Sequence, residues 1–375
     1  MYVTFSDLLD HALAYLGGDA GRANSDRARR AVLAAYQDLP TRHPWKHYQT
    51  LGRVVTVASY ATGTVAYTNS TRTVTLSGGT WPSWAASGTI VIADVPYDVE
   101  TRDSNSALTL GTAQNPGADV AALTSYTLYQ DTYAAPTDLL TGYELTLDAV
   151  GNRLAYRPPS EWAQLRRVNS TVGRPQLFCL TGGGTAAAGL VFRFWPAPDT
   201  IYPIDLLYKR RPRALAFDRK DAGTASATTS STALTGANTA FAAAMAGSVV
   251  RLAADNKDAP TGNDGNNRAQ FEGVISSVTS ATALTLAAVA DQTLAGVKYV
   301  ISDPADIDQD VHLRLLYRLI ERQCRIMARM KELPEEDREY QKALAEAREA
   351  DSRYAGRQVA GLNEVRPLRL RDYPI

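Results

Sequence analysis

The residues best suited to chemistry in this sequence are its four histidines and two cysteines. His43 and His47 are four residues apart, a spacing that can place two imidazoles on one face of a helix. Pro44 lies between them, and no carboxylate or cysteine follows at ligand spacing. Cys179 and Cys324 form neither a metal motif nor a redox motif. We therefore predict no metal site at these residues and no disulfide framework.

Two polar segments have part of an ion-binding pattern. The glycines at 182–184 are not followed by Lys-Ser/Thr, which favours a turn over a phosphate loop. Residues 255–267 carry Asp and Asn at spacings that suit calcium but lack the Glu that closes an EF-hand loop, which favours a mobile hydrophilic loop. No nucleophile–base pair is evident. The sequence thus predicts no catalytic residue, no cofactor and no metal, although a hydrolase site assembled only in space stays open.

The sharpest electrostatic feature is a stripe of five arginines in a predicted helix from 308 to 330. At about 100° per residue, the stripe covers about 80° of arc opposite an apolar face. Its members are Arg314, Arg318, Arg322, Arg325 and Arg329, and the apolar face holds Leu313, Leu316, Ile320, Cys324 and Met327. The pattern favours a solvated face paired with the acids of a second helix at 335–351. The alternative is a face for an acidic partner protein. DNA is less favoured, because no aromatic or polar readers interrupt the stripe.

The C-terminal segment 364–375 alternates leucine with arginine and contains two prolines, so it cannot be a helix. It reads as an extended tail, within about 357–375, that has one apolar and one basic side. Its apolar content favours docking onto a partner by strand addition or in a groove, with plain disorder as the alternative. With the stripe, its residues are our candidate partner interface: Arg366, Leu368, Arg369, Leu370, Arg371 and Tyr373.

Helical patterns at both termini must position these surfaces. Thr4 and Asp7 resemble a capping box, and apolar residues follow at helical spacing to Gly17-Gly18. Ser25-Asp26 opens a second helix that ends at Pro40, which makes an αα-hairpin. A strand is expected at 51–57, and Pro334 marks the start of the last helix. Between the termini, residues 126–212 have short apolar runs punctuated by Pro, Gly or Asp, which predicts an antiparallel sheet.

Two segments rich in Ser, Thr, Ala and Gly, 59–125 and 222–303, match each other in order. Gly63-Thr64 matches Gly223-Thr224, 81–91 matches 241–250, 104–110 matches 280–286, and Tyr126-Thr-Leu128 matches Tyr299-Val-Ile301. We predict one small β-barrel or sandwich module used twice. The fold class is α+β: a core of 1–58, 126–221 and 304–375 with helices and a sheet, and two inserted β modules at 59–125 and 222–303. Compositional bias that mimics a match is the alternative.

The composition excludes several classes of protein. The 375 residues hold 39 basic and 39 acidic side chains, so no global field recruits nucleic acid or anionic lipid. No apolar run approaches the ~20 residues of a membrane span. The N-terminus contains acids and lacks the basic flank of a signal peptide. We expect a protein that is assembled in a reducing cytoplasm.

In their order along the chain, these features resemble the head-to-tail adaptor, or connector, proteins of tailed bacteriophages, most closely the tail tubular A type. The resemblance covers 1–58, 126–215 and 304–375. It rests on Trp45, Tyr133-Ala-Ala-Pro-Thr-Asp138, Gly173-Arg-Pro175, Trp195-Pro-Ala-Pro-Asp199 and Leu207-Tyr-Lys-Arg-Arg-Pro212. The chain departs from the family pattern at Ala135, where Leu is usual, and in its two β insertions.

The resemblance implies a structural virion protein of the neck. It would form a ring of about twelve copies under the portal, receive tail or nozzle proteins and extend the DNA channel without reading sequence. It would not be an enzyme. The alternative is a surface glycan-binding or adhesin-like protein, suggested by the β modules and by Trp81 and Trp84; the helical arms count against it.

Overall fold

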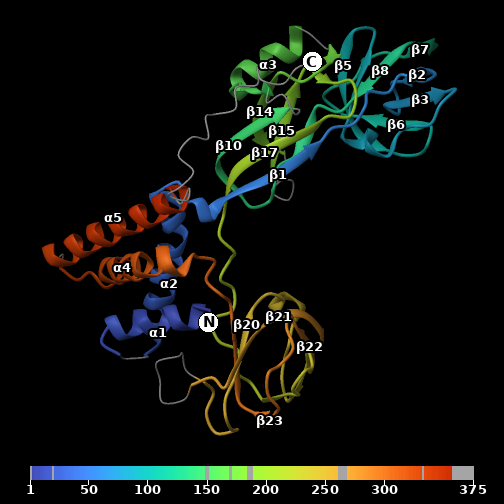
Figure 1. Ribbon diagram of the computed structural model, residues 1–375. Helices are drawn as coiled ribbons and strands as arrows, with labels where there is room; N and C mark the ends of the chain where they lie inside the picture. The colour runs from blue at the N-terminus through green and yellow to red at the C-terminus, as the bar shows by residue number, and fades with distance from the viewer. Residues whose placement is uncertain are drawn as a thin grey trace, which may run out of the picture. The chain divides into compact units, whose positions relative to one another are not determined.

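A computed structural model describes residues 2–18, 21–147, 152–168, 171–183, 189–260, 268–331 and 333–356. The chain divides into two compact units: Met1–Tyr48 with Pro212–Ile375, and Gln49–Arg211. Both combine helices with mostly antiparallel strands, so the fold class is α+β (Figure 1). Each unit contains one seven-stranded, barrel-like sheet.

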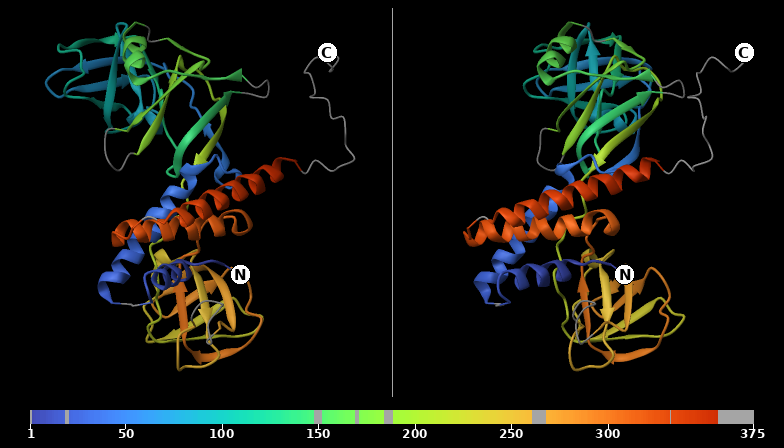
Figure 2. Two further views of the ribbon diagram at one scale, coloured as in Figure 1. Left: turned by 90° about the vertical axis from the view of Figure 1, so that its left-hand side faces the viewer. Right: turned by 60° about the vertical axis from the view of Figure 1, so that its left-hand side comes forward.

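Four helices of the first unit pack around one apolar core. They are α1 (Phe5–Tyr15), α2 (Arg22–Asp38), α4 (Gln309–Ala328) and α5 (Pro334–Gly356), with 3-10 turns η1 (Leu39–Arg42) and η2 (Lys46–Tyr48) after α2. Trp45 and Tyr48 are fully buried in this core, and Trp45 Nε1 donates a hydrogen bond to the carbonyl oxygen of Leu39 at 2.8 Å. Figure 2 shows α4 and α5 side by side.

Local chemistry sets the helix ends. Thr4 and Asp7 form the predicted capping box: the Thr4 backbone N–H donates to Asp7 Oδ2 at 2.9 Å, and Thr4 Oγ1 accepts from the Asp7 backbone N–H. Asp308 caps α4, as predicted, by accepting from the backbone N–H of Asp310. The predicted start of α2 at Ser25-Asp26 is wrong, because the helix begins at Arg22 after Gly21, which gives no side-chain cap.

Residues 130–212, the greater part of the predicted sheet region 126–212 that we call the central stretch, form three small sheets together with one strand that precedes the first module. The first has the order β1 (Gln49–Val55), β17 (Pro203–Arg210), β10 (Leu139–Leu147), β11 (Asn152–Arg153). The second has the order β12 (Ala155–Tyr156), β14 (Leu177–Gly182), β15 (Leu190–Trp195), β9 (Thr132–Ala134), and β13 (Val172–Gly173) pairs with β16 (Ala197–Pro198). The first two sheets enclose one apolar core that includes Leu145, Phe192 and Leu206.

Two features of this stretch differ from the predicted antiparallel sheet. The pairs β12–β14 and β13–β16 are parallel, because the chain crosses over between them instead of turning back. The segment 159–168 forms a helix, α3 (Pro159–Val168), which the sequence analysis missed. Pro159 occupies the first helical position, and Glu161 lies in the first turn, where the helix dipole favours an acid.

The two seven-stranded sheets have the same strand order. The first module contains β2 (Thr64–Thr68), β3 (Thr73–Ser77), η3 (Ser83–Ser87), β4 (Thr89–Ile92), β5 (Val95–Arg102), β6 (Ala107–Leu110), β7 (Val120–Thr124) and β8 (Tyr126–Tyr129). The second contains β18 (Thr224–Ala227), β19 (Ala233–Ala237), η4 (Ala243–Met245), β20 (Val249–Leu252), β21 (Phe271–Ser280), β22 (Ala283–Leu286), β23 (Leu294–Val297) and β24 (Tyr299–Ser302). The orders are β7-β2-β3-β6-β5-β4-β8 and β23-β18-β19-β22-β21-β20-β24. β8, which follows the predicted 59–125 module, is therefore a strand of this sheet.

The matched residues of the two modules make the same contacts. The Tyr126 hydroxyl donates to the carbonyl oxygen of Thr62, and the Tyr299 hydroxyl donates to that of Ala222, both at 2.7 Å. The next residue in each case is a glycine with positive φ, 85° at Gly63 and 89° at Gly223. A Cβ there would lie 2.2 Å and 2.3 Å from a carbonyl oxygen of the following hairpin. Both positions thus require glycine for conformation and for space.

Candidate functional site

The most distinctive polar site of the described chain is built around Arg251 in the middle of β20. Val250 and Leu252 belong to the core of the second module, so strand alternation puts Arg251 on the opposite face. That face lies against the start of α1, and Arg251 is only 3 % exposed. A buried guanidinium is stable only where anions and acceptors surround it.

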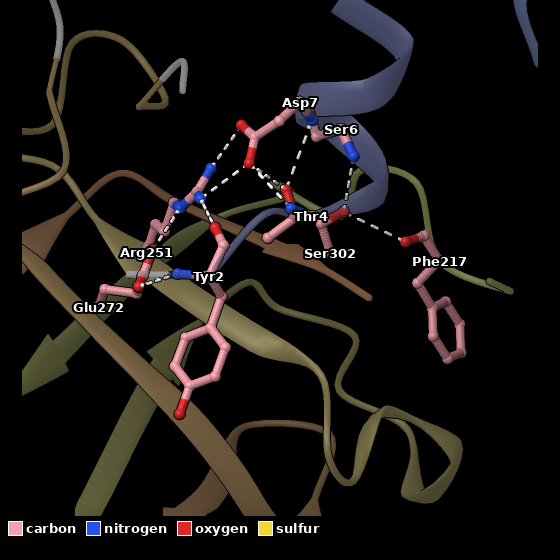
Figure 3. Close-up of polar contacts among 8 residues, drawn as sticks. All are labelled: Tyr2, Thr4, Ser6, Asp7, Phe217, Arg251, Glu272 and Ser302. Carbon is pink, nitrogen blue, oxygen red and sulfur yellow. Dashed lines mark hydrogen bonds and ion pairs between the residues drawn. The ribbon is translucent and has the colours of Figure 1, made fainter. Parts of the chain in front are cut away.

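Four hydrogen bonds satisfy the Arg251 side chain (Figure 3). Nη1 donates to Asp7 Oδ1 at 2.7 Å and Nη2 donates to Asp7 Oδ2 at 2.9 Å, which makes a bidentate pair. Nη2 also donates to the carbonyl oxygen of Tyr2 at 2.7 Å, and Nε donates to Glu272 Oε2 at 2.9 Å. Glu272 in turn accepts from the Tyr2 backbone N–H at 2.8 Å. Arg251 therefore joins the N-terminal strand-like segment, α1 and β21.

The electrostatics of the site favour a permanent ion pair. Burial opposes the charge on Arg251, but the carboxylates of Asp7 and Glu272 outweigh it, so the pKa of the guanidinium is raised. The physical role of this ion pair is to attach the second β module to α1.

A second buried acid strengthens this attachment. Asp303, directly after β24, is 1 % exposed. It accepts from the backbone N–H groups of Ala216 and Phe217 and from the Ser248 hydroxyl, all at 2.7 Å, and from Arg213 Nη2 at 3.1 Å. The neighbouring Ser302 hydroxyl accepts from the backbone N–H of Ser6 at 3.0 Å (Figure 3). The segment that enters the module and the strand that leaves it are thus held to each other and to α1.

Neither Arg251 nor Asp303 was among the residues predicted from the sequence. A usable signal was present, since a charge in the centre of Val249-Val250-Arg251-Leu252 is unusual for a buried strand. The register of the two modules places Val91 of β4 at the position of Arg251 in β20, and Pro96 at that of Glu272. The first module therefore lacks this ion pair, and the difference separates two modules of equal topology.

The arginine stripe of α4 faces α5. Arg314 Nη1 lies 2.5 Å from Glu346 Oε2, and Arg318 Nη2 lies 2.6 Å from Glu339 Oε2. Arg325 is 3 % exposed and pairs with Glu336 and Asp337. The remaining two members differ: the Arg322 guanidinium carbon lies 5.2 Å from the centre of the Tyr340 ring, and Arg329 is exposed. These contacts are those expected if the stripe pairs with the acids at 335–351.

The same acidic residues connect α5 to α1. The Tyr15 hydroxyl donates to Glu336 Oε1 at 3.0 Å. Burial and this hydrogen bond to a carboxylate raise the pKa of Tyr15 to about 12. Arg325 is thus part of the interior of the helical cluster, and it is not available to a partner.

Three of the four histidines gather in the helical core. His47 Nε2 lies 3.0 Å from Asp306 Oδ1, and His43 Nε2 lies 3.5 Å from Asp351 Oδ2. His312 is fully buried against Trp45, and its Nδ1 accepts from the backbone N–H of Asp308. Burial and the nearby His47 lower the pKa of His312 to about 4. Each of His43 and His47 has its own carboxylate, and the described residues contain no group of His, Cys, Asp or Glu that could hold a metal ion.

Several predicted features fall outside the described residues. These are Gly184 of the glycine run, residues 261–267 of the polar loop, and the whole tail with Arg366, Leu368, Arg369, Leu370, Arg371 and Tyr373. Cys179 and Cys324 are free and buried, and burial raises the pKa of Cys324 to about 12. Among the described residues, no helix is long and apolar enough to cross a membrane.

Comparison with known proteins identifies one family. A family model described as SU10 adaptor protein matches residues 101–292, slightly more than half of the chain. The matched range contains the central stretch and most of the second β module, whereas the resemblance seen in the sequence did not include the modules. No curated protein matches the chain.

Proposed function

The chain belongs to the SU10 adaptor protein family, a family of phage head-to-tail adaptors, and from this membership we propose that it forms a ring that joins the capsid portal to the tail. The ring would extend the channel for genomic DNA in the neck of the virion, after assembly in the host cytoplasm. Membership in this family implies a phage structural protein, not an enzyme. The single observation that carries the proposal is the family match over residues 101–292.

Several physical features support this role. The formal net charge is zero, which limits attraction to DNA that must slide past. The buried polar contacts of Arg251 and Asp303 attach the second module to α1, which suits a protein that joins two parts of a virion. We further infer that the modules are copies of one insert in a core of 1–58, 126–221 and 304–375. They would decorate the outer rim.

For the candidate interface, we propose a division of roles. Within the stripe, Arg314, Arg318 and Arg325 serve the α4–α5 contact, and the exposed Arg329 is available to a partner. The tail residues at 366–373 would dock onto the portal. Removing residues 364–375 should weaken portal binding and leave thermal unfolding unchanged. Equal portal binding by the truncated chain would refute the role of the tail.

Electron microscopy of the purified chain, alone and mixed with portal, tests the ring. Rings with a central channel, either alone or only on the portal, are the expected result. A chain that stays monomeric and ignores purified portal would refute the proposal. The glycan-binding alternative loses one of its motives, because Trp81 is 1 % exposed within the first module and cannot stack on a sugar. A glycan array without signal would retire it.

A further inference from the structure

A groove of about 360 Å³ lies between α1 and α2 in the first unit. Its apolar lining comes from Leu9, Leu13 and the fully buried Ala28. Two exposed acids, Asp10 and Asp26, also line it, and neither forms a salt bridge with any described residue. We name this feature the α1–α2 groove.

The other charges of the groove are already paired. Arg29 forms an ion pair with Asp218, and Arg219 Nε lies 2.8 Å from Asp221 Oδ2. The lining holds the carboxylates of Asp10, Asp26 and Asp218 against the guanidiniums of Arg29 and Arg219, so its net charge is negative. An apolar lining beside two unpaired carboxylates fits an apolar side chain flanked by cations.

A surface with those properties lies at the turn between α4 and α5. Ile326, Met330 and Leu333 are 56 %, 47 % and 51 % exposed, and we name these three residues the apolar knob. Exposed large apolar side chains that are this close in sequence at one turn are candidates for an interaction surface. Arg329 and Lys331 flank the knob, are exposed, and form no salt bridge within the described part of the chain.

The knob cannot fill the groove of its own chain. Ser6, Leu9, Asp10 and Leu13 lie on one side of α1, at about 100° per residue. His11 and Tyr15 lie on the opposite side, where His11 stacks on Tyr317 of α4 and Tyr15 bonds to Glu336 of α5. α1 therefore stands between the groove and the hairpin that carries the knob.

We propose that the apolar knob of one copy docks in the α1–α2 groove of the next copy, with Arg329 and Lys331 beside Asp10 and Asp26. Two different surfaces then meet at each contact, which is the heterologous arrangement that generates a ring when its rotation closes. The inference rests on the proposed ring and names the surfaces that would build it.

Engineered cysteines test the contact directly. The full chain carries Asp10→Cys together with Met330→Cys, and a short bismaleimide crosslinks it, either alone or on the portal. The native Cys179 and Cys324 are buried and should not react. A ladder of dimers, trimers and larger species is expected on a denaturing gel. The matched control replaces Asp10→Cys with Ser352→Cys, an exposed position on α5 outside the groove, and should give no ladder.

Charge exchange provides a second readout. In the chain that carries Asp10→Cys and Met330→Cys, Asp26→Lys, and separately Arg329→Glu with Lys331→Glu, should each lower the crosslinked fraction about tenfold or more, since like charges would face each other. All three charge substitutions together in that chain should restore the ladder. Rings in the electron microscope without a ladder, or with an equal ladder in the control pair, would overturn the knob–groove contact and leave the ring intact. Absence of both rings and ladder would refute the ring as well.

Discussion

Replacing Arg251 with methionine should weaken the attachment of the second β module to α1, while the bond between Ser6 and Ser302 remains. Methionine keeps most of the length of the side chain and removes the charge and all four hydrogen bonds of the guanidinium. Asp7 and Glu272 would then face each other as carboxylates without a cation. The capping bonds between Thr4 and Asp7 would remain, so α1 should still form.

The expected loss follows from the burial of the site. Removing one partner of a buried ion pair costs about 3–5 kcal/mol, mostly because the other partner is left without compensation. Asp7 and Glu272 each keep 17 % of their side-chain surface exposed, so water can relieve part of the penalty. We therefore expect a value near the lower end, about 3 kcal/mol, which corresponds to about a hundredfold change in an opening equilibrium.

Hydrogen exchange of α1 amides is the assay of choice, because a chain of two units does not unfold in one step. The matched control is Arg53→Met, which removes an ion pair with Asp205 that is open to solvent on both sides and should leave the exchange of α1 amides unchanged. Exchange in α1 should accelerate about a hundredfold in Arg251→Met and little in the control. A change below about threefold in Arg251→Met would refute the view that this ion pair holds α1 to the module.

Three further predictions concern His312, the arginine stripe and one glycine. The pKa of His312 is about 4 in the folded chain against 6.5 in the unfolded chain, so folding favours the neutral imidazole. The free energy of unfolding should therefore stay constant above pH 6.5. It should fall by up to about 1.4 kcal/mol per pH unit as the pH drops from 6.5 to 4. Urea unfolding across that range should show this slope, and His312→Gln should flatten it. Arg325→Ala should lower the melting temperature of the helical cluster by several degrees, at about 3 kcal/mol, whereas Arg314→Ala should cost under about 1 kcal/mol. In differential scanning calorimetry, equal decreases of the melting temperature in Arg325→Ala and Arg314→Ala would contradict the argument that burial makes Arg325 the more important residue. Gly63→Ala should cost at least about 3 kcal/mol, because its Cβ meets a carbonyl oxygen at 2.2 Å. Gly117→Ala, where φ is positive but no atom lies near the added Cβ, should lower the free energy of unfolding by about 1–2 kcal/mol in urea titrations. Equal losses in the two variants would show that the positive φ, and not the close carbonyl oxygen, sets the cost at Gly63.

Much of the framework could be predicted because its signals are local. The capping box at Thr4 and Asp7, the cap at Asp308 and the glycine stop after α1 depend on neighbours within a few residues, so the sequence carries them in full. The matched order of motifs predicted one β module used twice; the structure has two seven-stranded sheets of equal strand order, and the origin of both from one insert stays a prediction. α3 was missed because a short helix that starts at Pro159 resembles a turn between strands.

Long-range pairing set the limit of prediction. Arg251 meets Asp7 across 244 positions of the chain, and a sequence pattern gives no partner for either residue. The parallel pairs β12–β14 and β13–β16 likewise depend on crossovers that periodicity does not encode. Periodicity did place the five stripe arginines on one face and favoured pairing with the acids at 335–351, but the acid that each arginine meets depends on where Glu336 and Glu346 lie in space.

Comparing Val91 with Arg251 separates the features that the two seven-stranded sheets share from one that they do not share. Strand order, the tyrosine bond to a carbonyl and the positive-φ glycine are common to both modules, so these features specify the fold. A charge on the outer face of β20 adds nothing to that fold, and without Asp7 and Glu272 it would destabilise it. The contacts of Arg251 with Asp7 explain its position, because they attach β20 to α1. The function of a structural protein should therefore be sought at the residues that differ between modules of equal strand order. In this chain, those residues lie where the second module contacts α1.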